Sequence, residues 1–246
     1  MRSFFIALQF LTRLPVPDTG EVRAADAARS AGYYPLVGLL LGGMLAAVDG
    51  LARQFWPVSV ASALVLLAGV ALTGALHLDG LMDTCDGVFS LQPPERRLEI
   101  LRDSRVGAFG VIGGVLVLLL QYSLLSELTG PMRWRALLIM PLLGRWLVVY
   151  ALRRFPYARA VGLGQPFAGQ ARAIPWTWAS LFTLSVTLGL FPSILGWSLI
   201  LGTFLGAVAA ARFCQARLGG LTGDTYGAIN EVVETVALAL VVAWSR

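Results

Sequence analysis

The chain has 246 residues, of which 57% are hydrophobic and only 13% are charged, and its mean hydropathy is +0.73. A soluble globular domain carries about 25% charged residues, so this composition is typical of a membrane protein. All nineteen basic residues are arginine. The absence of lysine excludes Schiff-base chemistry and a Walker-type phosphate lysine. The two cysteines, Cys85 and Cys214, are too few for a disulfide framework and lack zinc spacing.

Apolar segments predict an all-α integral membrane protein, a polytopic helical bundle of about seven transmembrane segments that forms one domain over residues 1–246. The fifth and sixth segments are separated only by Pro192, which indicates a tight hairpin or a re-entrant segment. The shorter stretch from Met1 to Leu14 predicts an amphipathic helix at the membrane interface. The expected segments lie approximately at 33–51, 58–78, 107–126, 134–152, 176–191, 193–212 and 229–244.

The arginines predict the orientation of the bundle. If the N-terminus lies in the cytoplasm, fourteen of the nineteen arginines fall on the inner side and four on the outer side, as the positive-inside rule requires. The same topology explains the net charge of +5 without a nucleic-acid partner. The polar stretches at 79–86, 102–105 and 219–231 then all face the cytoplasm, where we expect the functional site.

One stretch, His77-Leu-Asp-Gly-Leu-Met-Asp-Thr-Cys-Asp-Gly87, carries three aspartates and the only histidine of the chain. In a helix, Asp79, Asp83 and Asp86 fall at i, i+4 and i+7, on one face. Carboxylates at such short distances repel one another unless a cation lies among them. Helix termination would explain one of these aspartates but not three. His77 is out of phase with that face and is expected to be a hydrogen-bonding partner rather than a ligand.

These aspartates predict a divalent metal at the membrane edge. They follow the second apolar segment, whose helix C-terminus would attract a cation through its dipole. Oxygen-only ligands favour Mg²⁺ or Mn²⁺ over Zn²⁺.

Two further polar stretches each open an apolar segment. In the stretch 102–110, Asp103 or Ser104 can cap the following helix, while Arg102 and Arg105 beside a helix N-terminus suit a phosphate.

The second of these stretches, 219–234, combines glycines with carboxylates. Asn230 and Glu234 lie at i and i+4, with Glu231 beside them. Glu234 lies within the apolar run and needs a partner, which could be a metal, Arg145 or a proton.

A metal site beside phosphate sites indicates phosphoryl or nucleotidyl transfer. The Asp79-x-x-x-Asp83 spacing resembles that of the CDP-alcohol phosphotransferases, although the longer pattern of that family is missing. A transporter, with Asp49, Arg145 and Glu234 along a pathway, is the non-enzyme alternative.

The closer resemblance is to the cobalamin synthase family of adenosylcobinamide-GDP ribazoletransferases. Residues 77–87 are similar to its His-Leu-Asp-Gly-Leu-x-Asp-Thr-x-Asp-Gly signature. Residues 101–110 and 223–231 match its later motifs, and residues 10–17 and 33–38 are similar too. The resemblance therefore covers nearly the whole chain.

This resemblance implies an Mg²⁺-dependent reaction in a bacterial cytoplasmic (inner) membrane. Adenosylcobinamide-GDP and α-ribazole, or its 5′-phosphate, would give adenosylcobalamin, or its 5′-phosphate, and GMP. The expected partners are these corrinoid and ribazole substrates and the lipid bilayer. A homo-oligomer and other cobalamin-assembly enzymes are further candidate partners.

Site residues are assigned on the same resemblance. We expect Mg²⁺ at Asp79, Asp83, Asp86 and Asp224. Asp83 is the first candidate for the base that takes the proton of the ribazole hydroxyl, with Asp79 and Glu231 as further catalytic residues. The residues expected to bind the substrates are His77, Arg102, Asp103, Arg105, Gly223, Thr225, Asn230 and Glu234.

Overall fold

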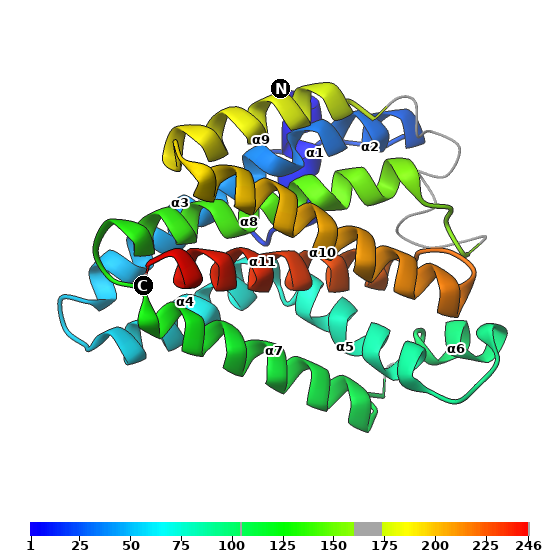
Figure 1. Ribbon diagram of the computed structural model, residues 1–246. Helices are drawn as coiled ribbons and strands as arrows, with labels where there is room; N and C mark the ends of the chain where they lie inside the picture. The colour runs from blue at the N-terminus through cyan, green and yellow to red at the C-terminus, as the bar shows by residue number, and fades with distance from the viewer. Residues whose placement is uncertain (104, 160–173, 246) are drawn as a thin grey trace.

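The computed structural model describes residues 1–103, 105–159 and 174–245, and these form a bundle of α-helices (Figure 1). Within the described residues there is no β-strand, only an isolated bridge between Tyr157 and Leu221. The predicted all-α fold is therefore confirmed. The helices are α1 (Arg2–Leu11), α2 (Ala24–Ser30), α3 (Tyr34–Ala52), α4 (Val58–Thr73), α5 (Leu76–Phe89), α6 (Pro94–Ile100), α7 (Ala108–Glu127), α8 (Gly130–Arg154), α9 (Trp176–Leu190), α10 (Ile194–Leu218) and α11 (Gly223–Ser245).

Five helical stretches of the described chain are long and apolar enough to cross a membrane. They are Ala24–Ala52, which contains α2 and α3, and the helices α7, α8, α10 and α11. The pair α4 and α5 would make a sixth if it is one broken span. Helix α9 has 15 residues and so rises about 22 Å, less than the roughly 30 Å of a bilayer core. The expected number of about seven is therefore higher than the five or six found.

The predicted segment 58–78 is broken after Thr73. Gly74 and Ala75 have φ values of 61° and 60°, a region that suits glycine and that alanine rarely adopts. The chain turns by 89° between α4 and α5, and Asp79 lies in the first turn of α5. The expectation that the aspartates follow the negative C-terminal end of a span is therefore wrong.

Helix α8 is the centre of the bundle. Of its membrane-length window, 83% is buried, compared with 22% for α7, and it packs mainly against α3 and α11. Helix α7 instead exposes large apolar side chains along its length, as a lipid-facing helix does. The predicted N-terminal helix is present as α1, which packs its buried face against α2 and α3.

A buried ion pair joins three helices at the end of the bundle where α3 ends and α8 begins. The guanidinium of Arg133 lies 2.6 Å from Asp49 Oδ1. It also donates to the carbonyls of Leu125 and Leu128 at the end of α7. Asp49 is thus held by Arg133, whereas the transporter alternative required it to line a pathway.

Gly42 and Gly43 are neighbours on α3 but face different surroundings. A Cβ on Gly42 would lie 2.6 Å from the Leu137 carbonyl oxygen of α8, whereas a Cβ on Gly43 would meet nothing within 4 Å. We predict that Gly42→Ala lowers the free energy of unfolding by about 1–3 kcal/mol through overpacking. Gly43→Ala should raise it by about 0.5–1 kcal/mol because alanine is the better helix former. Thermal unfolding in detergent measures both, and equal Tm values would contradict this α3–α8 contact.

Candidate active site

The motif helix α5 crosses α11 at very short range. A Cβ on Gly80 would lie 2.7 Å from the Asp224 carbonyl oxygen, and a Cβ on Gly227 would lie 2.9 Å from that of His77. The two backbones can approach this closely because each helix has a glycine at the contact. The crossing brings the 77–87 motif beside the start of the 223–234 motif.

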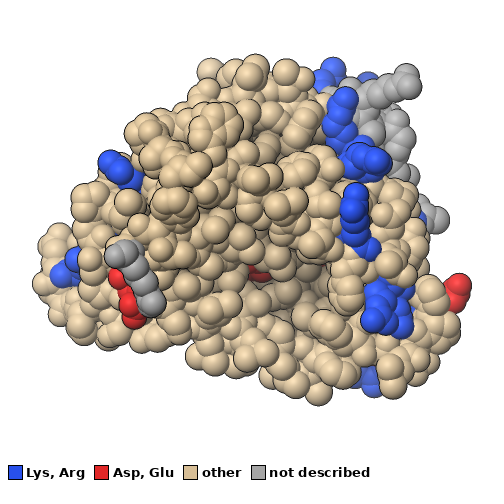
Figure 2. Space-filling model, in the orientation of Figure 1, with Lys and Arg blue, Asp and Glu red and all other residues tan. Residues whose placement is uncertain are grey.

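Carboxylates from both motifs gather at this crossing. Asp79, Asp83 and Asp86 lie on one helix, as predicted, and Asp83 interacts electrostatically with the other two and with Asp224. Asp79 is exposed, while Asp83 and Asp224 are half-buried. Figure 2 shows basic side chains along the edge of the molecule at which α6 and the start of α11 lie in Figure 1. The acidic group is thus at an arginine-rich end of the bundle.

Asp224 has an arginine partner that sequence reasoning did not assign to the site. Arg159 Nη2 lies 3.0 Å from Asp224 Oδ2, and Thr222 donates its hydroxyl to the same oxygen at 3.2 Å. The bridge between Tyr157 and Leu221 places Arg159 here, because it joins the segment after α8 to the segment before α11. No sequence spacing indicates this pairing, which depends on a long-range contact.

Asp86 differs from the other aspartates because both of its oxygens accept backbone hydrogen bonds. Gly107 N–H donates to Oδ2 and Gly110 N–H donates to Oδ1, each at 2.8 Å. These are N–H groups of the first turn of α7, which have no partners within their own helix. Asp86 therefore caps α7 from a neighbouring helix. Of the other expected metal ligands, Asp224 is engaged by Arg159 and Thr222 through one oxygen, which leaves Asp79 and Asp83 the least engaged.

The expectation that Asp103 caps α7 is wrong, and the alternative cap Ser104 lies outside the described residues. Asp103 instead binds Arg105, whose Nη2 lies 2.7 Å from Oδ2. This hydrogen-bonded pairing lowers the pKa of Asp103 to about 2. Both side chains are exposed, as is Arg102, and the segment that carries them leads to Gly107, whose N–H donates to Asp86.

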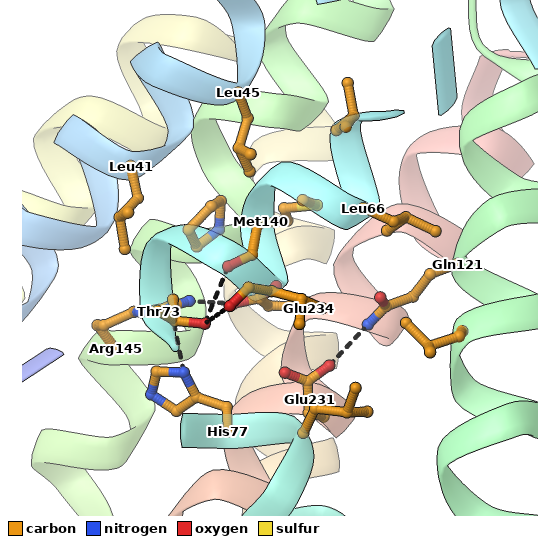
Figure 3. Close-up of a pocket in the computed structure, with 16 residues that line it drawn as sticks. Leu41, Leu45, Leu66, Thr73, His77, Gln121, Met140, Arg145, Glu231 and Glu234 are labelled. Carbon is orange, nitrogen blue, oxygen red and sulfur yellow. Dashed lines mark hydrogen bonds and ion pairs between the residues drawn. The ribbon is translucent and has the colours of Figure 1, made fainter. Parts of the chain in front are cut away.

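A second polar group lies deeper in the bundle, around Arg145 of α8 (Figure 3). Its guanidinium forms an ion pair with Glu234 and lies 3.2 Å from His77 Nδ1. Asn230 donates to the same Glu234 oxygen at 2.8 Å. The partner expected for Glu234 is therefore found, and His77 is a hydrogen-bonding residue as predicted.

Glu231 lies beside this group and accepts a hydrogen bond from Gln121 of α7 at 3.1 Å. Gln121 also lies 3.1 Å from the Thr235 hydroxyl. A cavity of about 50 Å³ is lined by Glu231, Glu234 and Arg145 together with apolar side chains. The structure thus places Glu231 and Glu234 at this cavity, while Asn230 holds the Glu234 carboxylate without lining the cavity itself.

The Thr225 side chain forms hydrogen bonds within the turn at the start of α11. Its hydroxyl accepts from Thr222 N–H at 2.8 Å, and the side chain is fully buried. Gly223 begins α11 and, with His77 and Tyr226, lines a second cavity of about 40 Å³. Thr225 therefore shapes the start of α11, next to Asp224.

The donor set of the acidic group suits a hard divalent cation, because Asp79, Asp83 and Asp224 offer only oxygen and outnumber Arg159. As the side chains stand, no three His, Cys, Asp or Glu residues of the described chain converge into a ready metal-binding arrangement. The residues fit such an ion by chemistry and charge, and the side chains would have to rearrange to hold it.

The fold and site together define a polytopic helical membrane protein with an acidic site at one end of its bundle. The family model described as cobalamin-5-phosphate synthase matches residues 3–242. The chain belongs to this family.

Curated relatives are similar over almost their whole length. The chain is 42% identical to the adenosylcobinamide-GDP ribazoletransferase of Desulfitobacterium hafniense (strain Y51), over 97% of this chain and 95% of that protein. It is 42% identical to the enzyme of that name from Roseiflexus sp. (strain RS-1), over 95% of this chain and 86% of the other. No solved structure matches the chain.

The different contacts of Asp86 and Asp83 lead to a stability prediction. Asp86→Ala should lower the free energy of unfolding by about 0.5–2 kcal/mol, as loss of a helix cap does. Asp83→Ala should change it by no more than about 0.5 kcal/mol, or raise it, because it removes repulsion among carboxylates. Thermal unfolding without divalent ions compares the two. A larger loss for Asp83→Ala would contradict the capping role of Asp86.

Proposed function

We propose that this chain joins adenosylcobinamide-GDP to α-ribazole, or to its 5′-phosphate, and releases GMP. Membership of the family and the names of its curated relatives support this activity. The structural observation that carries the proposal is the crossing of α5 and α11, which brings carboxylates of two separate motifs to one place. A pyrophosphate substrate needs such a site, because its charge must be neutralised before an alcohol can approach.

In the proposed reaction, a hydroxyl oxygen of the ribazole bonds to the cobinamide-side phosphorus of the pyrophosphate. The bond from that phosphorus to the GMP oxygen breaks, and GMP leaves with the electron pair. The hydroxyl proton passes to a carboxylate, for which Asp83 is our first candidate because it lies among the acidic side chains.

Asp79, Asp83 and Asp224 are the residues that we propose to hold Mg²⁺. The ion would supply neutralising charge for the pyrophosphate and for the leaving GMP. Arg159 orients Asp224 through its ion pair. Arg102 and Arg105, on the exposed segment that leads into α7, would attract the phosphates by charge.

We place the acidic end of the bundle on the cytoplasmic face of a bacterial inner membrane. Basic side chains gather along one edge of the molecule (Figure 2), the edge at which the start of α11 lies in Figure 1, which agrees with the positive-inside rule. Corrinoid and ribazole substrates would then reach the site from the cytoplasm. A homo-oligomer and contacts with other cobalamin-assembly enzymes remain predictions.

Formation of GMP from adenosylcobinamide-GDP and α-ribazole by the purified protein tests the proposal. We expect activity with Mg²⁺ and loss of activity with a chelator, restored by added Mg²⁺. Asp79→Asn, Asp83→Asn and Asp224→Asn should each lower kcat/KM by about 100-fold or more, because each removes charge that stabilises the transition state. Glu127→Gln, at the far end of α7, is the matched control and should retain activity.

Two outcomes would overturn parts of this proposal. Full GMP release by all three asparagine variants would exclude the metal site at the crossing. Turnover of CDP-alcohols without turnover of cobinamide-GDP would favour the phosphotransferase alternative.

A further inference from the structure

We propose that Arg145 is a positioning residue of the acidic site, because its guanidinium holds α5 and α11 in the crossing that brings Asp79 and Asp83 to Asp224. Arg145 does not belong to the acidic group itself. The proposal rests on the proposed function for its kinetic test, and on the packing of α5 for an independent one.

The contacts of Arg145 join three helices through one side chain. From α8, one terminal nitrogen pairs with Glu234 of α11 and the other lies 3.2 Å from His77 Nδ1 of α5. Arg145 is only 3% exposed. The planar guanidinium offers donors in fixed directions, so it sets the relative position of two partners in a way that a single ammonium group cannot.

One partner of Arg145, His77, lies at the crossing, and the other, Glu234, lies about two helical turns along α11 from it. Gly227 of α11 packs against the backbone of His77. His77 precedes Asp79 by two residues. Asn230, which fixes the Glu234 carboxylate, follows Gly227 by three residues. Because a helix moves as a unit over such short distances, a shift of His77 against α11 also shifts Asp79 and Asp83 against Asp224.

A buried ion pair can also serve stability alone, and the chain contains a matched pair for comparison. Arg133 lies on the same helix α8 and pairs with Asp49, with exposed fractions of 0% and 7%. For Arg145 and Glu234 the values are 3% and 11%. The two pairs share chemistry and burial, but only the Arg145 pair contacts α5 and α11.

The first experiment removes each pair completely. Loss of one partner leaves a buried charge, whereas loss of both avoids that cost. The double variant Arg145→Met, Glu234→Met should therefore have a higher Tm than Arg145→Met alone. Its kcat for GMP release should nevertheless stay about 10- to 100-fold below that of the parent with KM changed little, because the reacting groups are misplaced.

The control double variant Asp49→Leu, Arg133→Met should keep the parental kcat within about twofold per folded molecule, even if its Tm falls. If both double variants keep the parental kcat, the Arg145 pair is only a stability element and the proposal fails. It also fails if both lose kcat equally.

The conservative variant Arg145→Lys separates charge from shape. The lysine ammonium group can neutralise Glu234. It lacks the planar guanidinium of arginine, so it cannot contact Glu234 and His77 at the same time in the same geometry. Its Tm and kcat should lie between those of the parent and of Arg145→Met. A parental kcat in Arg145→Lys would show that the bridge to His77 is not needed.

A second readout does not depend on transferase activity. Cys85 of α5 is buried, packs with Leu81 and with Ala228 of α11, and lies against Gly113 of α7. Its reaction with N-ethylmaleimide therefore reports separation of α5 from these two neighbouring helices. In a Cys214→Ser background, the Arg145 and Glu234 double variant should react about tenfold faster than the parent, through easier local opening. The Asp49 and Arg133 double variant should react at the parental rate.

The two readouts distinguish failure of the proposed function from failure of the positioning role. If the parent releases no GMP, the proposed function fails and the alkylation rates alone decide whether Arg145 holds the crossing. Equal alkylation of Cys85 in all variants would overturn the positioning role whatever the activity.

Discussion

The close contact between α5 and α11 is the constraint on which the candidate site depends. Helix pairs in a membrane gain little from excluding water, so they associate through packing and polar contacts. The glycines at this crossing let the backbones approach, and the same approach brings Asp224 to the aspartates of α5. The close packing of α5 on α11 therefore also brings their carboxylates together and concentrates negative charge.

That concentration of charge explains why the three aspartates of α5 have different partners. Asp86 gives both oxygens to the start of α7, where backbone N–H groups and the helix dipole stabilise a carboxylate. Arg159 offsets Asp224. Asp79 and Asp83 are left as the carboxylates with the greatest need of a cation; Asp79 is exposed and Asp83 is half-buried. One aspartate of the motif thus stabilises the start of α7, and the other two are the ones that we propose to bind the metal.

The local features of the site could be predicted from the sequence, and its long-range contacts could not. Helical periodicity was enough to place Asp79, Asp83 and Asp86 on one face, and an intramembrane Glu234 pointed to a partner such as Arg145. The break at Gly74 and Ala75 was missed because apolar residues continue through it and hydropathy does not record φ. The bond from Asp86 to α7 and the pair of Arg159 with Asp224 depend on packing between distant segments, for which no local pattern exists.

Helix α8 carries two buried arginines, Arg133 near its start and Arg145 deeper in the bundle. An arginine within the apolar interior is tolerated only where a carboxylate and further acceptors surround it. Arg133 meets this requirement with Asp49 and two carbonyls of α7, and Arg145 meets it with Glu234 and His77. Because α8 is also the most enclosed of the membrane-length helices, these partners cannot move without disturbing the core.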